Sequence, residues 1–111
     1  MRVSKLKLPL EALFENANFI LTAVSPYYEY REGEKTEHLL GYKYEVVEDG
    51  NFERFSVKVP SIKPIITAEV LEKSSSRIFV TFEDAFGRIY QTPAGSLEIS
   101  FSALSVKLLE A

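Results

Sequence analysis

Aromatic and basic side chains are interleaved in several short segments of this chain. The segments are YYEYR (27–31), YKY (42–44), RFSVK (54–58) and RIY (88–90). A single-stranded nucleic acid is held by flat aromatic faces on which bases stack, together with cations that follow its phosphates. These residue types therefore predict a single-strand-binding surface. Its candidate residues are Tyr28, Tyr30, Arg31, Lys43, Arg54, Lys58 and Arg88.

The same tyrosines also suit ordinary β-structure, because aromatic residues are common in strands. Alternation along a strand puts Tyr42 and Tyr44 on one face and Lys43 on the other, and the sequence leaves open which face is the core. Three tyrosines within residues 27–30, next to Pro26, cannot all point inward. At least one should be exposed, either to bind a partner or to cover a sheet edge.

Residues suited to catalysis are scarce. His38 is the only histidine, there is no cysteine, and the five glycines are isolated, which excludes a thiolate zinc site and a glycine-rich phosphate loop. No serine is marked as a nucleophile, and the sixteen acidic residues are scattered. We therefore expect a protein that is not an enzyme, with no catalytic residues, metal or cofactor.

Length and composition predict one globular domain over residues 1–111, with 46% hydrophobic and 26% charged residues. The lack of cysteine, of an apolar run long enough for a membrane and of a signal peptide predicts a cytoplasmic chain with no membrane partner. The net charge of −3 argues against a dedicated duplex-DNA binder, so any contact with nucleic acid needs a locally positive surface.

Short strands separated by turns must position the candidate residues. The clearest is a hairpin with Asp49-Gly50 at its tip, since Asp-Gly between two alternating runs is a strong turn signal. A short helix is predicted over 9–17, a loop at YYEYR after a strand that Pro26 limits, and turns at 86–87 and 93–95. The predicted strands cover 19–25, 36–47, 52–59, 66–73, 77–83 and 97–109, with one more short strand between the last two turns.

Within 97–109 the apolar positions shift from Leu97, Ile99 and Phe101 to Leu104, Val106 and Leu108, which predicts a bulge or bend. Strands with a strong bend favour a small curved antiparallel barrel. We therefore expect a mainly β fold, an OB-like barrel with one short N-terminal helix. A second expectation concerns its core, which should contain Phe14, Phe19, Phe55, Val57, Ile78, Val80, Phe82, Ile99 and Phe101.

The order of segments resembles a family of small single-strand-binding-like proteins encoded by integrative and conjugative elements of Gram-positive bacteria. Some of these act as helicase processivity factors. The segments that carry the resemblance are ALFENANFILTAV, GEKTEHLLGYKYEVVEDG, FSVKVPSIKP and SLEISFSALSVKLLEA. The loop FGRIYQTPAGS is an addition to the family pattern.

The resemblance implies an OB-like fold and binding of single-stranded DNA without sequence preference. It also implies an accessory role beside a helicase or relaxase during transfer or replication of a mobile element. The alternative is a protein–protein interaction or structural module of a phage or plasmid, in which the tyrosines form the interface. The sequence leaves homo-oligomerisation open.

Overall fold

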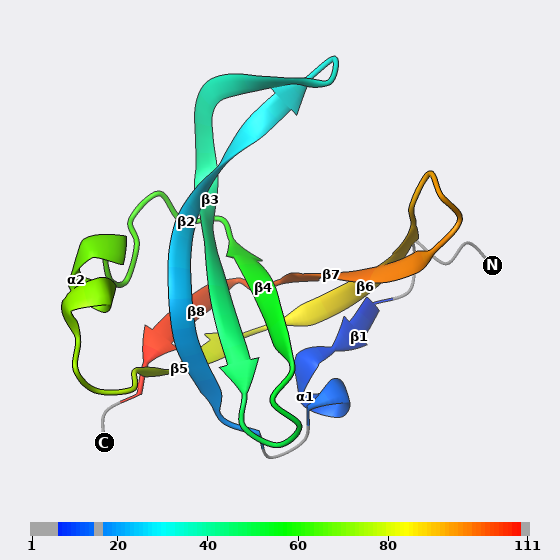
Figure 1. The fold of residues 1–111 in the computed structure, drawn as a ribbon. Helices are drawn as coiled ribbons and strands as arrows, with labels where there is room; N and C mark the ends of the chain where they lie inside the picture. The colour runs from blue at the N-terminus through cyan, green and yellow to red at the C-terminus, as the bar shows by residue number, and fades with distance from the viewer. Residues whose placement is uncertain (1–6, 15–16, 110–111) are drawn as a thin grey trace.

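The computed structural model describes residues 7–14 and 17–109 of the chain (Figure 1). These residues form mainly strands and two short helices. The elements are β1 (Lys7–Pro9), α1 (Leu10–Leu13), β2 (Phe19–Arg31), β3 (Glu34–Glu48), β4 (Arg54–Val59), α2 (Ala68–Lys73), β5 (Phe79–Glu83), β6 (Phe86–Gln91), β7 (Leu97–Ser102) and β8 (Ser105–Leu108).

All eight strands belong to one sheet, in the order β1-β6-β7-β4-β3-β2-β5-β8. The mainly β prediction is confirmed, but the sheet is mixed, because β4 and β7 run parallel while the other pairs are antiparallel. A parallel neighbour needs a long crossover, and the chain from residue 60 to 96 supplies it. The prediction of an antiparallel barrel is therefore wrong at this pair, and the sheet is not closed into a barrel.

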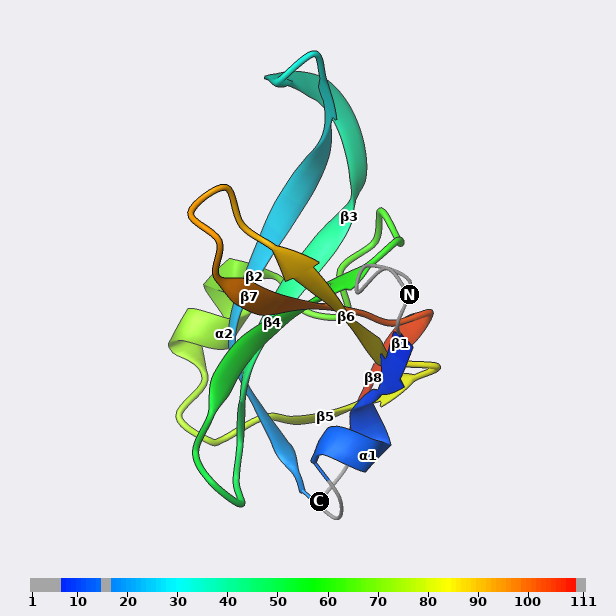
Figure 2. The same cartoon turned by 90° about the vertical axis from the view of Figure 1, so that its right-hand side faces the viewer.

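Two bent ribbons curl the sheet. β5 continues into β6 through Asp84 and Ala85, and β7 continues into β8 through Ala103 and Leu104. Because β6 pairs with β7 and β5 with β8, the two ribbons follow each other around the bend (Figure 2). The bend predicted within 97–109 is confirmed. The bend also sets Asp84 at a φ of 50°, a left-handed conformation uncommon for residues other than glycine.

The core lies on the inner face of the curled sheet. Val57, Val80 and Phe101 are buried as predicted, whereas Ile99 is 41% exposed and its predicted burial is wrong. Ile99 lies in the third residue pair from the turn of the β6–β7 hairpin, and Leu97 beside that turn on the same face is 63% exposed, so burial decreases toward the end of the hairpin. The other predicted members are half-buried and pack against the core: Phe14, Phe19, Phe55, Ile78 and Phe82. Tyr44 is 1% exposed, and its hydroxyl accepts a hydrogen bond from the backbone N–H of Ile65 at 3.2 Å.

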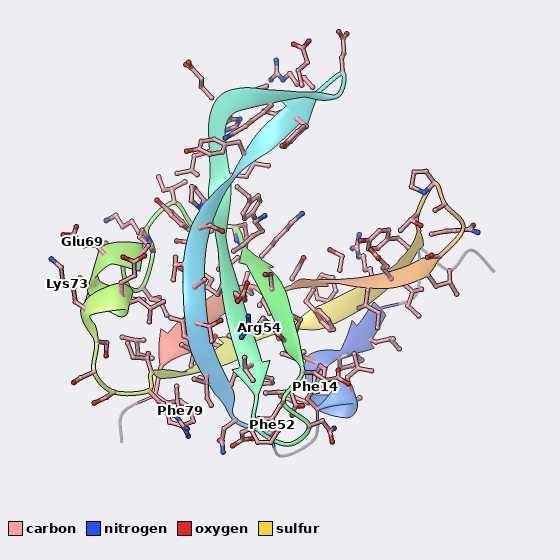
Figure 3. All side chains as sticks on the ribbon, in the orientation of Figure 1. Phe14, Phe52, Arg54, Glu69, Lys73 and Phe79 are labelled. Carbon is pink, nitrogen blue, oxygen red and sulfur yellow. The ribbon has the colours of Figure 1, made fainter. Side chains whose placement is uncertain are left out.

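The strand predicted over 66–73 is wrong, because this segment forms α2. Thr67 caps the helix by accepting a hydrogen bond from the N–H of Val70 at 3.2 Å. Glu69 and Lys73, one turn apart, form an ion pair of 3.0 Å (Figure 3). The helix predicted over 9–17 is shorter than expected, with α1 at Leu10–Leu13, and residues 15–16 lie outside the described residues.

The predicted loop at YYEYR is also wrong, because β2 continues without a break to Arg31. Pro26 is tolerated in this strand, since β2 pairs with β5 only at Phe19 and Ile20 and thus has an unpaired edge further along. Similarly, Gly87 lies inside β6 and not in a turn. A Cβ at Gly87 would collide with Ile99 and Phe101, so close packing explains this glycine.

The hairpin predicted at Asp49-Gly50 is confirmed, with Val46 opposite Phe55 across β3 and β4. Its loop extends to Glu53, whose carbonyl accepts a hydrogen bond from the N–H of Glu48 at 2.9 Å. The side chain of Glu48, 1% exposed, organises the loop from within. It accepts hydrogen bonds from the N–H groups of Gly50, Asn51 and Glu53 at 2.8, 2.7 and 3.2 Å.

Candidate nucleic-acid interface

Four neighbouring strands, β3, β4, β7 and β6, present an outer face opposite the core. Strand alternation assigns each side chain to a face. Val46 on β3, Val57 on β4 and Phe101 on β7 are buried, so the residues next to each of them along its own strand point outward. We call this outer surface the basic face. It comprises Lys43, Glu45, Arg54, Ser56, Lys58, Glu98, Ser100, Ser102, Phe86, Arg88 and Tyr90.

A row of partners crosses the basic face from strand to strand. Lys43 lies opposite Lys58, Lys58 lies beside Ser102, and Ser102 lies opposite Phe86. The backbone adds a link at this point, because the N–H of Ala103 donates to the carbonyl of Lys58 at 3.0 Å. The row thus brings residues of two separate hairpins, β3–β4 and β6–β7, onto one surface.

Two lysines directly opposite each other are an unfavourable cross-strand pair. Neither Lys43 nor Lys58 forms an ion pair with any residue in 7–14 or 17–109, and the same holds for Arg88. Among the four cations of the basic face, only Arg54 forms an ion pair with a described residue, Glu45 at 3.6 Å. Three cations of the basic face therefore have their charge available for an anion.

The charge of the basic face is opposite in sign to that of the chain. It carries four cations against the two carboxylates of Glu45 and Glu98, a surplus of two positive charges, while the whole chain has a net charge of −3. Glu98 is engaged by Tyr90, whose hydroxyl donates to it at 2.8 Å, and this bond raises the pKa of Tyr90. The local positive surface that the sequence required is thus present.

Small hydroxyl side chains separate the cations. Ser56 lies opposite Glu45 on β3, and Ser100 lies opposite Arg88 on β6. Ser102 completes the set next to Lys58. Such residues let an extended backbone approach the sheet, and their hydroxyls can donate to phosphate oxygens.

The other three predicted site residues, Tyr28, Tyr30 and Arg31, lie elsewhere. They belong to a hairpin of residues 28–40, here called the arm, in which β2 and β3 pair only with each other in the described chain. The arm extends away from the rest of the sheet (Figure 1). Tyr30 is 65% exposed, and Tyr28 has the Lys35 ammonium 4.5 Å from its ring centre.

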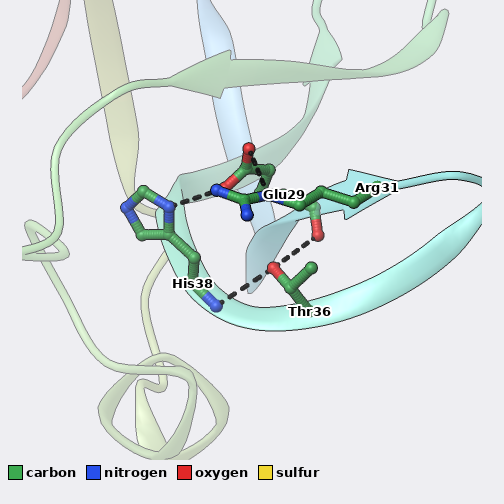
Figure 4. A network of polar contacts seen from close by, with 4 residues as sticks. All are labelled: Glu29, Arg31, Thr36 and His38. Carbon is green, nitrogen blue, oxygen red and sulfur yellow. Dashed lines mark hydrogen bonds and ion pairs between the residues drawn. The ribbon is translucent and has the colours of Figure 1, made fainter.

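Arg31 is held within the arm by a small polar network (Figure 4). Its Nε lies 3.2 Å from one oxygen of Glu29, while Nδ1 of His38 lies 2.8 Å from the other. These hydrogen bonds, first that of His38 and then that of Arg31, lower the pKa of Glu29. Thr36 ties the strands together by donating to the carbonyl of Glu29 at 2.8 Å. The arm carries four glutamates against two cations, so its charge differs in sign from that of the basic face.

An open pocket at one end of the basic face was missed from the sequence. It has a volume of about 440 Å³ and is lined by Tyr27, Lys58, Pro60, Asp84, Phe86, Ser102, Ala103 and Leu104. We call it the Tyr27 pocket. Its lining comes from four separate parts of the chain, and no local pattern in the sequence links them.

Tyr27 takes its place because of Gly41 on β3. The two residues are partners across β2 and β3, and a Cβ at Gly41 would collide with the Val59 carbonyl and the Tyr27 ring. The Tyr27 ring therefore occupies the space that a side chain at position 41 would need, with the Lys58 ammonium 5.6 Å from the ring centre. Partial burial raises the pKa of Tyr27. The sequence alone does not reveal that Tyr27 pairs with Gly41, because this pairing follows from the register of β2 and β3.

Comparison with protein-family models, curated proteins and solved structures finds no match to this chain. Among residues 7–14 and 17–109, no helix is long and apolar enough to cross a bilayer. The same residues contain no cluster of three or more His, Asp or Glu side chains able to hold a metal ion. The candidate interface consists of the basic face and the Tyr27 pocket.

Proposed function

We propose that this protein binds single-stranded DNA along the basic face and has no catalytic activity. The observation that carries the proposal is the uncompensated pair Lys43 and Lys58, opposite each other on an exposed sheet surface. Such a pair is unfavourable in the free protein and becomes favourable when a polyanion lies across it. Tyr27, Phe86 and Tyr90 stand near the cations and offer rings for base stacking.

The strand connectivity supports an OB-like assignment for the fold. If each bent ribbon counts as one strand, the five strands are β2, β3, β4, β5–β6 and β7–β8. OB-folds bind oligonucleotides on the face of their second and third strands and with the loops that join strands 1–2 and 4–5. Here these correspond to β3 and β4, to the arm, and to the loop over 92–96. The arm and the β6–β7 hairpin extend toward the same end of the molecule (Figures 1 and 2).

The proposed setting is cytoplasmic, as an accessory protein of a conjugative mobile element that keeps a single strand accessible to a helicase or relaxase. This part rests on the resemblance of the four sequence segments. The arm belongs to the proposal through Tyr28 and Tyr30, which would stack on a strand that leaves the basic face. Arg31 would contribute less than the other cations because Glu29 already holds it.

A second candidate function, a protein-interaction module, is favoured by the composition of the arm. Its four glutamates and the exposed ring of Tyr30 suit a basic protein surface better than a phosphate backbone. The two functions are compatible, because the arm and the basic face are different surfaces. They differ in which variants impair binding to an oligonucleotide.

The test is fluorescence anisotropy with a labelled oligonucleotide, single-stranded and duplex, at several salt concentrations. The affinity for the single strand should fall with salt, with a log–log slope of about −0.7 per phosphate neutralised. The double variant Lys43→Gln, Lys58→Gln should bind all sequences more weakly. It should also flatten the salt slope by an amount that corresponds to about one to two fewer phosphates neutralised. Duplex DNA should bind less well, because its bases are not free to stack.

The matched control is Lys73→Gln with Lys107→Gln, which removes the same charge from α2 and β8. Both lysines are exposed and paired with acids away from the basic face. The control should bind like the wild type. No binding to a long single strand at low salt and micromolar protein would refute the proposal, and equal losses in the two double variants would show that only net charge matters.

A further inference from the structure

The Tyr27 pocket opens onto the basic face at the end of its cross-strand row. Lys58, Ser102 and Phe86 belong both to the row and to the pocket lining. A DNA strand that lies across Lys43 and Lys58 would therefore pass the mouth of the pocket. The volume of about 440 Å³ is within the range of small-molecule sites, roughly 300–1,000 Å³.

The walls of the pocket suit a flat heterocycle. Tyr27 from β2 and Phe86 from β6 supply aromatic rings, and Pro60 and Leu104 supply apolar surface. A tyrosine hydroxyl is neutral at physiological pH, so the Tyr27 ring brings no negative charge near a phosphate. The Arg88 guanidinium lies 5.3 Å from the Phe86 ring centre and Lys58 lies over Tyr27, so a cation accompanies each ring. Rings with nearby cations are what stacked bases and their phosphates require.

Asp84 adds a hydrogen-bonding group to this lining. Its carboxylate has no hydrogen-bond or ion-pair partner among residues 7–14 and 17–109, since the nearby Lys107 is paired with Glu83. Its backbone, with φ of 50°, is fixed by the bend between β5 and β6. Residues held in such sparsely populated conformations concentrate at functional sites.

An ionised carboxylate only accepts hydrogen bonds, and this limits which base it can receive. Cytosine offers the N4 amino group as a donor, and adenine and guanine also carry amino groups. At the position of that amino group thymine carries the O4 carbonyl, and its one donor, N3–H, lies between two carbonyl oxygens that repel a carboxylate. The Asp84 carboxylate is therefore better matched to a base with an exocyclic amino group than to thymine.

From these contacts we propose that the Tyr27 pocket receives one unstacked base of the bound strand and favours a base with an exocyclic amino group over thymine. This inference rests on the proposed single-strand binding and adds a base preference to it. Lys58 and Ser102 at the mouth would hold the phosphate next to that base.

The test compares oligo(dC) with oligo(dT) of equal length, both labelled, by anisotropy at slightly alkaline pH, where oligo(dC) stays unfolded. The wild type should bind oligo(dC) more tightly by about five-fold or more, the lower end of what one good base contact gives. Asp84→Asn, which keeps the shape but not the charge, should bring the ratio close to one. It should do so mainly by improving the binding of oligo(dT).

Two further variants protect the result from trivial explanations. Asp84→Gly should fold, because glycine accepts the positive φ at this position without strain, and it should also lose the preference. Glu72→Gln removes one exposed negative charge on α2 and should keep the preference of the wild type. Thermal melts of each variant check that the fold is retained.

The outcomes separate the two proposals. If neither oligonucleotide binds, the proposed function is refuted and this inference with it. If both bind with equal affinity, or oligo(dT) binds better, the base preference is refuted while single-strand binding stands. A dC preference that persists in Asp84→Asn would likewise refute the role of Asp84.

Discussion

Lys43 and Lys58 lie opposite each other across β3 and β4, and the proposed DNA binding would use a pair that is unfavourable in the free protein. Two like charges that face each other across neighbouring strands are destabilising, so removal of one of them should relieve the repulsion. Lys43→Gln should raise the unfolding free energy of the free protein by about 0.2–1 kcal/mol. The urea midpoint measures this, and the affinity for single-stranded DNA should fall in the same variant.

A lower urea midpoint in Lys43→Gln would contradict this account, since it would mean that Lys43 stabilises the sheet through its stem. Lys58→Gln provides the reciprocal measurement on β4. The double variant should gain no more than either single variant, because one substitution already removes the repulsion.

Glu48 has a purely structural role at the β3–β4 loop. Glu48→Ala leaves three backbone N–H groups without their acceptor and should lower the unfolding free energy by about 1–3 kcal/mol. Chemical denaturation measures the change. Glu53→Ala, at an exposed position in the same loop, is the control and should change stability by no more than about 0.5 kcal/mol.

The arm is the element in which stacking and charge can be separated. Tyr28→Ala and Tyr30→Ala should weaken binding of a single strand without changing the salt slope, because stacking releases few counterions. Arg54→Ala with Lys58→Ala should flatten the slope, because these residues lie on the basic face. Anisotropy at several salt concentrations distinguishes the two effects.

If the arm tyrosines have no effect on DNA binding, the arm is better explained as a protein-docking element. Its exposed acids and Tyr30 would then be available to a basic partner while DNA occupies the sheet. The basic-face variants would still weaken DNA binding in that case.

Element prediction from the sequence succeeded where the signal was local. The Asp49-Gly50 hairpin and the bend within 97–109 depend on turn chemistry and on a change of parity, and both are confirmed. It failed at 66–73, where a cap at Thr67 and a Glu69–Lys73 pair indicated a helix that the alternating apolar residues obscured. At YYEYR, Pro26 suggested a break, because the sequence does not reveal that one edge of β2 is unpaired.

The candidate site was predictable only in part, because local sequence patterns do not determine which strands are neighbours in the sheet. Lys43 and Lys58 were within reach, since a hairpin register brings them together. Their proximity to Phe86 and Arg88 depends on the parallel pairing of β4 with β7, over forty residues apart in the chain. The Tyr27 pocket depends on that pairing and on both bends, so it could not be foreseen.

At the scale of the whole molecule, carboxylates that join distant segments predict sensitivity to acid. Hydrogen bonds from Asn18, first its backbone N–H and then its side chain, lower the pKa of Asp49, and an ion pair with Lys107 lowers the pKa of Glu83. A pKa that is lower in the folded state contributes stability above the unfolded value. This stability is lost as the pH falls through the folded value.

The melting temperature should therefore decrease from about pH 4 downward, near the ordinary range of carboxyl groups. Asp49→Asn should melt at a lower temperature than the wild type at neutral pH, and the two should converge in acid. Thermal melts across this range measure the difference. Parallel curves for the two proteins would show that the Asn18–Asp49 contact makes no contribution through its charge.

The parallel seam between β4 and β7 has a consequence for local opening. The pairing there covers only two residue pairs, Val57 with Phe101 and Lys58 with Ser102, while β2 and β3 are paired along most of their length. The amide of Ala103, which donates to the Lys58 carbonyl, should therefore exchange with solvent faster than the amides of the β2–β3 ladder. A DNA strand bound across Lys43, Lys58, Ser102 and Phe86 would contact both sides of this parallel pairing and hold β4 and β7 together. The amide of Ala103 should then exchange more slowly when DNA is present, and this change in exchange rate would measure binding.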